Sequence, residues 1–222
     1  MFTHRWWQGE TLDLPVGKAV CIGRNYAEHA RELNNPVPKQ PLLFHKPATA
    51  FCELSDSLQL ARPGLHFETE LALLIGAPLN AQSVNPWSAV IGVTLALDLT
   101  DRDLQAELKQ AGHPWERAKA FDGALPIGTW LPIEKMPANV ADWSYRLDMN
   151  GALRQHGQVS QMLCAPAQLL ELILVDFSLQ PGDVVLTGTP AGVGVLSTGD
   201  DLLLRLDNTD WQQRCRLASP GS

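Results

Sequence analysis

Two glutamates lead directly into an apolar run at residues 66–76, His-Phe-Glu-Thr-Glu-Leu-Ala-Leu-Leu-Ile-Gly. Side chains of an extended segment alternate between two faces, so Glu68 and Glu70 should share a face where a buried strand begins. Such close like charges repel each other and lose hydration, and therefore need a compensating cation. Because the ligands are oxygens, Mg2+ or Mn2+ suits them better than Zn2+. A strand with a solvated acidic face is the alternative, which the short Glu-x-Glu pattern alone favours.

The composition is that of an ordinary soluble globular protein, with 45% hydrophobic and 18% charged residues among 222. This length allows one large domain or two small ones, and we find no internal repeat or interdomain linker. The net charge of -7 does not favour a nucleic-acid partner. No apolar run approaches the roughly 20 residues of a membrane span, and the first residues lack a signal-peptide core. We expect a cytoplasmic protein with no membrane partner. The cysteines are expected to be reduced thiols, at positions Cys21, Cys52, Cys164 and Cys215.

Apolar runs and turn signals predict many strands interrupted by short helices. We expect one strand that ends at Gly23, strands over 42–47, 66–76, 90–97 and 199–206, and one that begins at Val184. Helices are expected over 25–33, 99–108 and 166–177, and a hairpin over 147–155 turns at Asn-Gly. Three prolines in 36–41 predict a loop that is either a lid or a connector.

Asp98 closes the apolar strand 90–97 and precedes a predicted helix. A carboxylate in this position either caps the helix or binds something. Thr100 or Asp101 is better placed as the N-cap, because Asp98 lies one or two residues too early. This favours Asp98 as a third ligand beside the two glutamates.

Three further features carry possible chemistry. His29 and Glu32 are three residues apart on a predicted helix, so the Glu32 carboxylate could orient the imidazole as a general base. The alternative is an incidental ion pair on the helix surface. Spacing alone favours this alternative. Lys119 lies among small and aromatic residues that could hold its ammonium against an anionic intermediate. The loop 187–194 contains three glycines and two threonines, which let backbone N–H groups approach a small anion.

Six motifs in order resemble those of the fumarylacetoacetate hydrolase family, particularly its short bacterial and mitochondrial members that act on acylpyruvates and oxaloacetate. The motifs are Gly23-Arg24-Asn25-Tyr26 with His29 and Glu32, Leu43-Phe44-His45-Lys46-Pro47, Glu68-Thr69-Glu70, Leu97 to Asp103, Ala118 to Phe121, and Leu186 to Gly194. The resemblance runs from Gly17 to about Leu206. It implies a mixed α/β, mainly β fold, a mixed β-sandwich roll with short helices, in one catalytic domain over 1–222 that usually forms a homodimer. Residues 1–16 would be an N-terminal extension and 207–222 a polar tail.

The resemblance also implies roles for individual residues. The metal ligands would be Glu68, Glu70 and Asp98, holding Mg2+ or Mn2+, and the catalytic residues would be His29, Glu32 and Lys119. Substrate contacts would come from Arg24, Tyr26, Lys46, Arg102, Gln105 and Thr189.

We therefore predict a metal-dependent hydrolase that cleaves the C–C bond of a small 3-acylpyruvate, such as fumarylpyruvate or acetylpyruvate. His29 would activate water, and the metal with Lys119 would stabilise the departing pyruvate enolate. The same site without the water step would catalyse oxaloacetate decarboxylation or keto-enol tautomerisation. A metal-dependent module that binds small dicarboxylates without turnover is the alternative from a different class.

Overall fold

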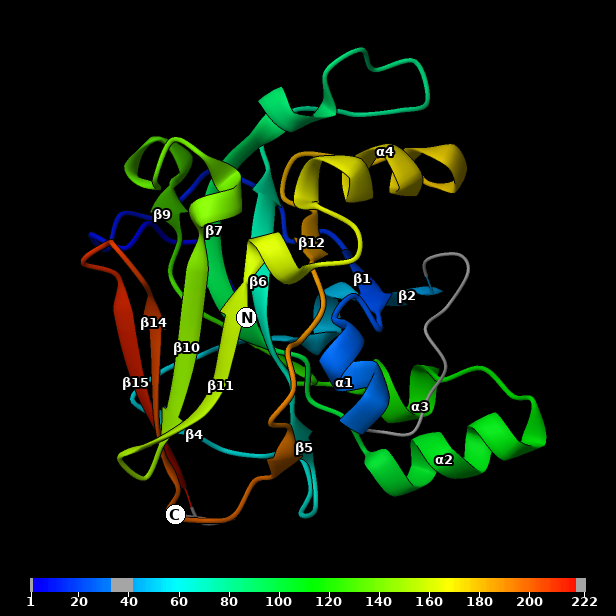
Figure 1. Ribbon diagram of the computed structural model, residues 1–222, viewed down its shortest axis with the longest axis vertical. Coiled ribbons are helices and arrows are strands. Elements are labelled where there is room, and N and C mark those ends of the chain that lie inside the picture. Colours follow the sequence, from blue (N-terminus) through cyan, green and yellow to red (C-terminus); the bar gives the residue numbers. More distant parts are fainter. Residues whose placement is uncertain (1, 33–41, 219–222) are drawn as a thin grey trace.

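The computed structural model describes residues 2–32 and 42–218, and strands dominate it (Figure 1). The strands are β1 (Ala19–Gly23), β2 (Leu42–Lys46), β3 (Phe51–Glu53), β4 (Ser57–Leu58), β5 (His66–Phe67), β6 (Thr69–Ile75), β7 (Val90–Leu97), β8 (Leu125–Ile127), β9 (Leu131–Pro132), β10 (Ser144–Met149), β11 (Ala152–Gln158), β12 (Val184–Leu186), β13 (Gly194–Val195), β14 (Asp201–Leu206) and β15 (Gln212–Leu217). The α-helices are α1 (Ala27–Glu32), α2 (Arg102–Ala111), α3 (Glu116–Lys119) and α4 (Pro166–Asp176). Short 3-10 helices cover Ala48–Ala50, Pro86–Ala89, Ile133–Lys135, Val140–Asp142 and Val159–Gln161.

The larger sheet has the strand order β2-β1-β12-β6-β7-β8-β3, and β9 also pairs with β7. Its central strands β6 and β7 are apolar along nearly their whole length because the sheet is covered on both faces. On β6, Leu71 and Leu73 belong to the main core, whereas Ala72 and Leu74 belong to a second core on the opposite face. This alternation places Glu70 on the side of the second core.

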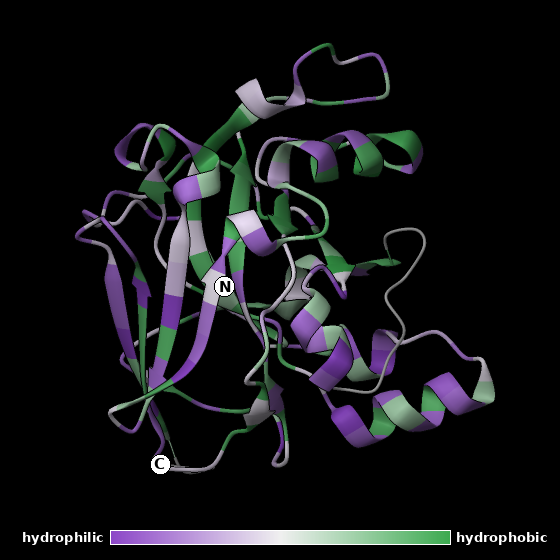
Figure 2. Cartoon of the chain, in the orientation of Figure 1, coloured by the Kyte–Doolittle hydropathy of each residue, from purple (hydrophilic) through white to green (hydrophobic). Residues whose placement is uncertain are grey.

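The second sheet has the order β11-β10-β14-β15-β4 and packs against the first, with β14 against β7. Its strands alternate in burial, as expected for a sheet with one solvated face. In Figure 2 its β11 and β15 are largely hydrophilic, in contrast to β6 and β7. The predicted hairpin is present as β10 and β11, whose turn residues Asn150 and Gly151 have φ values of 53° and 81°.

The helices lie at the two ends of the larger sheet: α1, α2 and α3 gather near one end and α4 lies toward the other (Figure 1). Helix α2 is capped by Asp101, whose side chain accepts from the Leu104 N–H at 3.1 Å. This leaves Asp98 outside the capping role, as expected. Across residues 2–32 and 42–218, no helix is long and apolar enough to cross a membrane.

The mixed, mainly β fold is confirmed, but several predicted boundaries change. Residues 212–217, expected in a polar tail, form β15, whose buried Cys215 and Leu217 alternate with exposed polar residues. Apolar side chains of the expected N-terminal extension, Trp6 among them, pack against the second core of the larger sheet. Helix α2 begins at Arg102, after the predicted N-cap Asp101, and continues to Ala111, three residues beyond the predicted end. The proline-rich segment 36–41 lies outside the described residues.

Candidate active site

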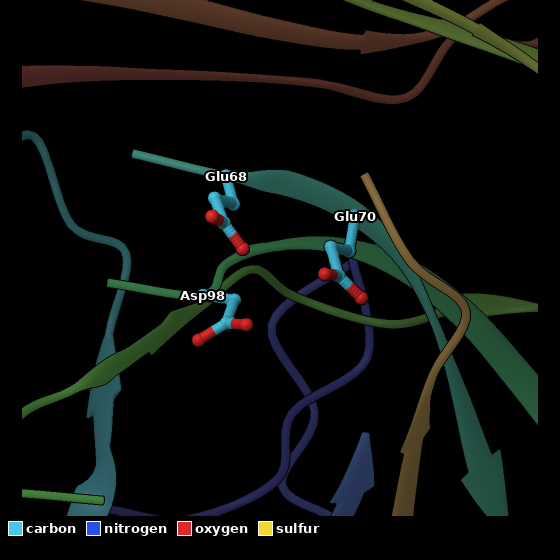
Figure 3. A group of neighbouring side chains, drawn as sticks. All are labelled: Glu68, Glu70 and Asp98. Atoms are coloured by element: carbon cyan, nitrogen blue, oxygen red, sulfur yellow. The ribbon is translucent and has the colours of Figure 1, made fainter. Parts of the chain in front are cut away.

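The end of the β6–β7 pair brings three carboxylates together. Register pairs Thr69 with Leu97, and the Asp98 N–H donates to the Glu68 carbonyl at 2.8 Å. Figure 3 shows the side chains of Glu68, Glu70 and Asp98, here called the acidic triad, converging from the two neighbouring strand ends. One carboxylate oxygen from each lies within 4.8 Å of the others, and all three residues are buried.

Two lysines neutralise part of this charge. Lys119 Nζ donates to Glu68 Oε2 at 2.7 Å and to Asp98 Oδ2 at 2.6 Å. Burial alone would lower the pKa of Lys119, but Asp98 and Glu68 outweigh burial and hold it above its ordinary value. Lys46 Nζ lies 2.8 Å from Asp98 Oδ1. Asp98 is therefore held from both sides by buried ammonium groups.

The two glutamates have opposite surroundings. Glu68 also pairs with Arg102. Burial would raise the pKa of Glu68, but Lys119 and Arg102 hold it well below the ordinary value. Glu70 has no ion-pair partner among the described residues and accepts from the Gly188 N–H at 2.6 Å. Burial and the charges of Asp98 and Glu68 raise its pKa.

The Gly188 amide reaches Glu70 because the backbone there has φ +91°. A Cβ at this position would lie 2.7 Å from Cβ of Asn25, so the position requires glycine. In the loop 187–194, where backbone N–H groups were expected to approach a small anion, the Gly188 N–H binds the carboxylate of Glu70.

The donor set of the triad fits a hard divalent cation. All three groups are buried carboxylates that lie close together, and Mg2+ and Mn2+ prefer oxygen ligands. Lys119 and Arg102 both form ion pairs with Glu68. The negative charge of Glu70 has no such cation beside it among the described residues. A divalent ion would supply the missing positive charge, so we assign the triad as its candidate ligands.

A cavity opens beside the triad, lined by Ile22, Gly23, Arg24, His29, Phe44, Arg102, Gln105, Lys109, Trp115, Lys119 and Thr189. Of the predicted catalytic residues, His29 and Lys119 line it. His29 Nδ1 lies 3.4 Å from Glu32 Oε2, and Glu32 in turn accepts from the Gly192 N–H at 3.1 Å. Burial lowers the pKa of His29, although Glu68 and Glu32 oppose this shift. Burial therefore favours the neutral imidazole.

Two of the predicted substrate contacts, Lys46 and Tyr26, are buried. Lys46 is fully buried, and its ammonium also donates to the carbonyls of Ala124 at 3.0 Å and of Lys119. Tyr26 is buried with its hydroxyl 3.4 Å from that of Tyr145. Neither side chain is part of the cavity wall. Lys46 thus contacts Asp98 of the acidic triad, and Tyr26 contacts Tyr145, while their role in substrate binding stays a prediction.

Thr189 lines the cavity as predicted, but its hydroxyl is already engaged. It donates to the Thr69 carbonyl at 2.9 Å and accepts from Gln155 Nε2 at 2.9 Å. Since a hydroxyl has one proton, Thr189 can only accept a further hydrogen bond from a bound molecule.

Two residues near the acidic triad and the cavity, Gln155 and Lys109, were not predicted from the sequence. Gln155 comes from the second sheet and is 86 residues from Thr69, so no local pattern could have revealed it. Lys109 lies four residues after Gln105 on α2, and helical spacing could have placed it on the same face. Its ammonium donates to Gln105 Oε1 at 3.3 Å.

Comparison with known proteins gives a consistent result. The family model for the fumarylacetoacetate (FAA) hydrolase C-terminal region matches residues 18–218. Oxaloacetate tautomerase YcgM of Escherichia coli is 43% identical over 210 residues, covering 93% of this chain and 96% of that protein. A mitochondrial oxaloacetate tautomerase of Caenorhabditis elegans is 43% identical over 187 residues, covering 82% and 86%. The structure of fumarylpyruvate hydrolase from Pseudomonas aeruginosa in complex with Mn2+ and pyruvate aligns with a TM-score of 0.86 at 31% identity, covering 98% and 95%.

Proposed function

Because the chain belongs to the fumarylacetoacetate hydrolase family, we propose that it is a divalent-metal-dependent enzyme that interconverts the enol and keto forms of oxaloacetate. The observation that carries this proposal is the acidic triad with Lys119 bridging two of its carboxylates at the cavity wall. The similarity to two oxaloacetate tautomerases at 43% identity supports the substrate.

Glu68, Glu70 and Asp98 would hold the Mg2+ or Mn2+ ion. When bound, such an ion supplies Lewis-acid polarisation to the oxygens of an α-keto acid. The similarity to a hydrolase described in complex with Mn2+ and pyruvate supports both the ion and the class of ligand.

The chain's own residues would move the proton. Tautomerisation transfers a proton between C3 and the C2 oxygen and needs neither water nor a redox partner. With Nδ1 facing Glu32, neutral His29 carries its proton on Nδ1 and has the lone pair of Nε2 available as a base. Lys119 contributes positive charge at the cavity wall, where negative charge develops on the enolate oxygen. The proton taken from C3 returns to that oxygen.

Acylpyruvate hydrolysis, which the sequence analysis placed first, is now the second candidate. The named relatives at 43% identity are tautomerases, whereas the fumarylpyruvate hydrolase is 31% identical. Hydrolysis would use the same residues, with His29 activating water instead of taking a proton from carbon. Decarboxylation of oxaloacetate requires the same enolate stabilisation. The activities of the named relatives argue against a binding module without turnover.

A substrate panel tests the proposal. Purified protein with Mn2+ would be mixed with enol oxaloacetate, and the decay of enol absorbance would be compared with Mn2+ alone. Pyruvate release from oxaloacetate reports decarboxylation, and loss of fumarylpyruvate or acetylpyruvate reports hydrolysis. We expect enol decay far above the metal-only rate without matching pyruvate release. Hydrolysis of an acylpyruvate with no acceleration of enol decay would replace the proposal by the second candidate.

A further inference from the structure

One face of α2 forms a wall of the cavity through Arg102, Gln105 and Lys109. Their spacing of three and four residues places them on the same side of the helix. Arg102 Nη1 and Lys109 Nζ both donate to Gln105 Oε1, at 2.9 and 3.3 Å. A single amide oxygen therefore holds two cations at the cavity wall.

Lys109 is also held by Trp115. Its ammonium lies 5.0 Å from the centroid of the indole ring, within the range of a cation–π contact. The side chain is only partly exposed. Contacts with Gln105 and Trp115 already restrict the Lys109 side chain. Binding of a ligand to its ammonium group would therefore cost little additional side-chain entropy.

Among the described residues, Lys109 differs from the cavity cations Arg102 and Lys119 in making no ion pair with a carboxylate. Arg102 and Lys119 both pair with Glu68. Within residues 2–32 and 42–218, Lys109 makes no ion pair with a carboxylate. Burial and the positive charges of Arg24 and Arg102 lower its pKa to about 8. An anion bound beside it would relieve this uncompensated charge.

The cavity is thus polarised, with the acidic triad at one side and Lys109 on the α2 wall. We propose that Lys109 binds the carboxylate of the substrate that is remote from the metal ligands, so that the site selects α-keto acids with a second carboxylate. This inference rests on the proposed function. It assigns Lys109 a role in substrate choice and none in the proton transfer.

The test compares ligands that differ only in the remote carboxylate. Malate and 2-hydroxybutyrate have the same backbone, but a methyl group replaces the second carboxylate in 2-hydroxybutyrate. Each would be titrated calorimetrically into the Mn2+-loaded protein, a readout that needs no turnover. Lys109→Met removes the charge and keeps an unbranched apolar stem against Trp115, whereas Lys109→Arg keeps the charge. Lys135→Met, on an exposed 3-10 helix, is the matched control.

We expect Lys109→Met to weaken malate binding by about tenfold or more, as for a lost charge-assisted hydrogen bond, and to leave 2-hydroxybutyrate within about twofold. Lys109→Arg should restore part of the malate affinity, and Lys135→Met should match the wild type. In turnover, the KM of oxaloacetate should rise in Lys109→Met with little change in kcat. Equal losses for both ligands, or no loss for either, would overturn the inference. Wild-type protein that binds malate in this Lys109-dependent way without accelerating enol decay would instead overturn the proposed function alone.

Discussion

Gln155 Oε1 accepts a hydrogen bond of 2.9 Å from the backbone N–H of Thr69, the residue between the two glutamates of the acidic triad. Strand β12 pairs with β6 only as far as Leu186 opposite Ala72, so Thr69 has no strand partner on that edge. In place of a strand partner, Gln155 accepts from the Thr69 N–H, and the Thr189 hydroxyl donates to the Thr69 carbonyl. Side chains thus take the place of a strand partner beside Glu68 and Glu70.

This relationship predicts that Gln155 positions Glu68 and Glu70 for metal binding. In Gln155→Glu the amide donor to Thr189 is lost, and Mn2+ affinity should fall by about tenfold or more, as for other residues that orient metal ligands. The Mn2+ electron paramagnetic resonance spectrum of the bound ion should change as well. Calorimetric Mn2+ titration measures the affinity.

Gln213 provides the matched control, because it also bridges two backbone groups, the Thr129 N–H at 3.3 Å and the Leu54 carbonyl, but these groups lie outside the acidic triad and its strand. Gln213→Glu should lower thermal stability and leave Mn2+ affinity unchanged. If both variants lose stability and neither loses affinity, Gln155 has only a structural role. Thr189→Val, which breaks the same network from the other side, should repeat the loss of affinity.

Glu70 is predicted to matter for the metal and not for the metal-free fold. Glu70→Gln removes one of three anionic ligands, so Mn2+ and Mg2+ affinity should fall by about 100-fold or more. The metal-free variant should be as stable as the wild type or more so, because a neutral amide removes repulsion with Glu68 and Asp98. Thermal melts with and without metal and calorimetry test both halves, with exposed Glu171→Gln as the control. An unchanged Mg2+ affinity would mean that Glu70 is not a ligand.

His29 is predicted to act on the proton and not on the metal. His29→Ala should slow enol decay by about 100-fold or more and leave Mn2+ affinity near the wild-type value, since His29 is not a ligand. His156→Ala, which changes an exposed histidine on β11, should alter neither. Loss of acylpyruvate hydrolysis with retained tautomerisation would identify His29 as a water activator only and favour the hydrolytic reading.

The buried His4 side chain should make the fold less stable in acid. Trp130 Nε1 donates to His4 Nδ1 at 3.0 Å, and His4 Nε2 lies 3.2 Å from the Gly182 carbonyl, so the buried ring is neutral with its proton on Nε2. Burial lowers its pKa from 6.5 to about 4. Between these pH values the unfolded chain binds a proton at His4 that the folded chain does not, so stability falls as pH falls through this window. The gap corresponds to about 3 kcal/mol, with no further loss from this group below about pH 4.

Chemical denaturation at a series of pH values measures this effect, and His4→Gln isolates it from the other histidines. A glutamine can accept from Trp130 and donate to Gly182 without titrating. The variant should therefore show a shallower decline in unfolding free energy between pH 6.5 and 4. Parallel pH profiles for the two proteins would show that His4 does not contribute.

The clustering of the acidic triad could be predicted from sequence because the position of each carboxylate follows from local geometry. Glu68 and Glu70 share a face through the period of two in a strand, and Asp98 ends the next apolar run too early to be a helix cap. Lys46 illustrates the opposite case. A lysine before a proline on an edge strand is ordinarily solvated, and only the tertiary fold shows that this one is buried beneath Asp98.

Contacts between the sheets were also beyond prediction. The role of Gln155 depends on β11 of the second sheet reaching the end of β6, a pairing of residues 86 positions apart. Strand β15 was overlooked because its exposed positions are Gln212, Arg214 and Arg216, which read as a polar tail until the opposite face is seen to be buried. The sandwich roll came from the family resemblance, since periodicity indicates strands but not how their sheets stack.

The enol decay catalysed by this protein should depend strictly on a bound divalent metal. Protein would be dialysed against EDTA and then into metal-free buffer, and enol oxaloacetate decay would be recorded before and after addition of Mn2+, with matched reactions that lack protein. We predict that chelation abolishes the protein-dependent rate and that Mn2+ restores it in the wild type, with restoration in Glu70→Gln only at much higher Mn2+ concentration. A protein-dependent rate that survives complete removal of divalent metal would contradict it.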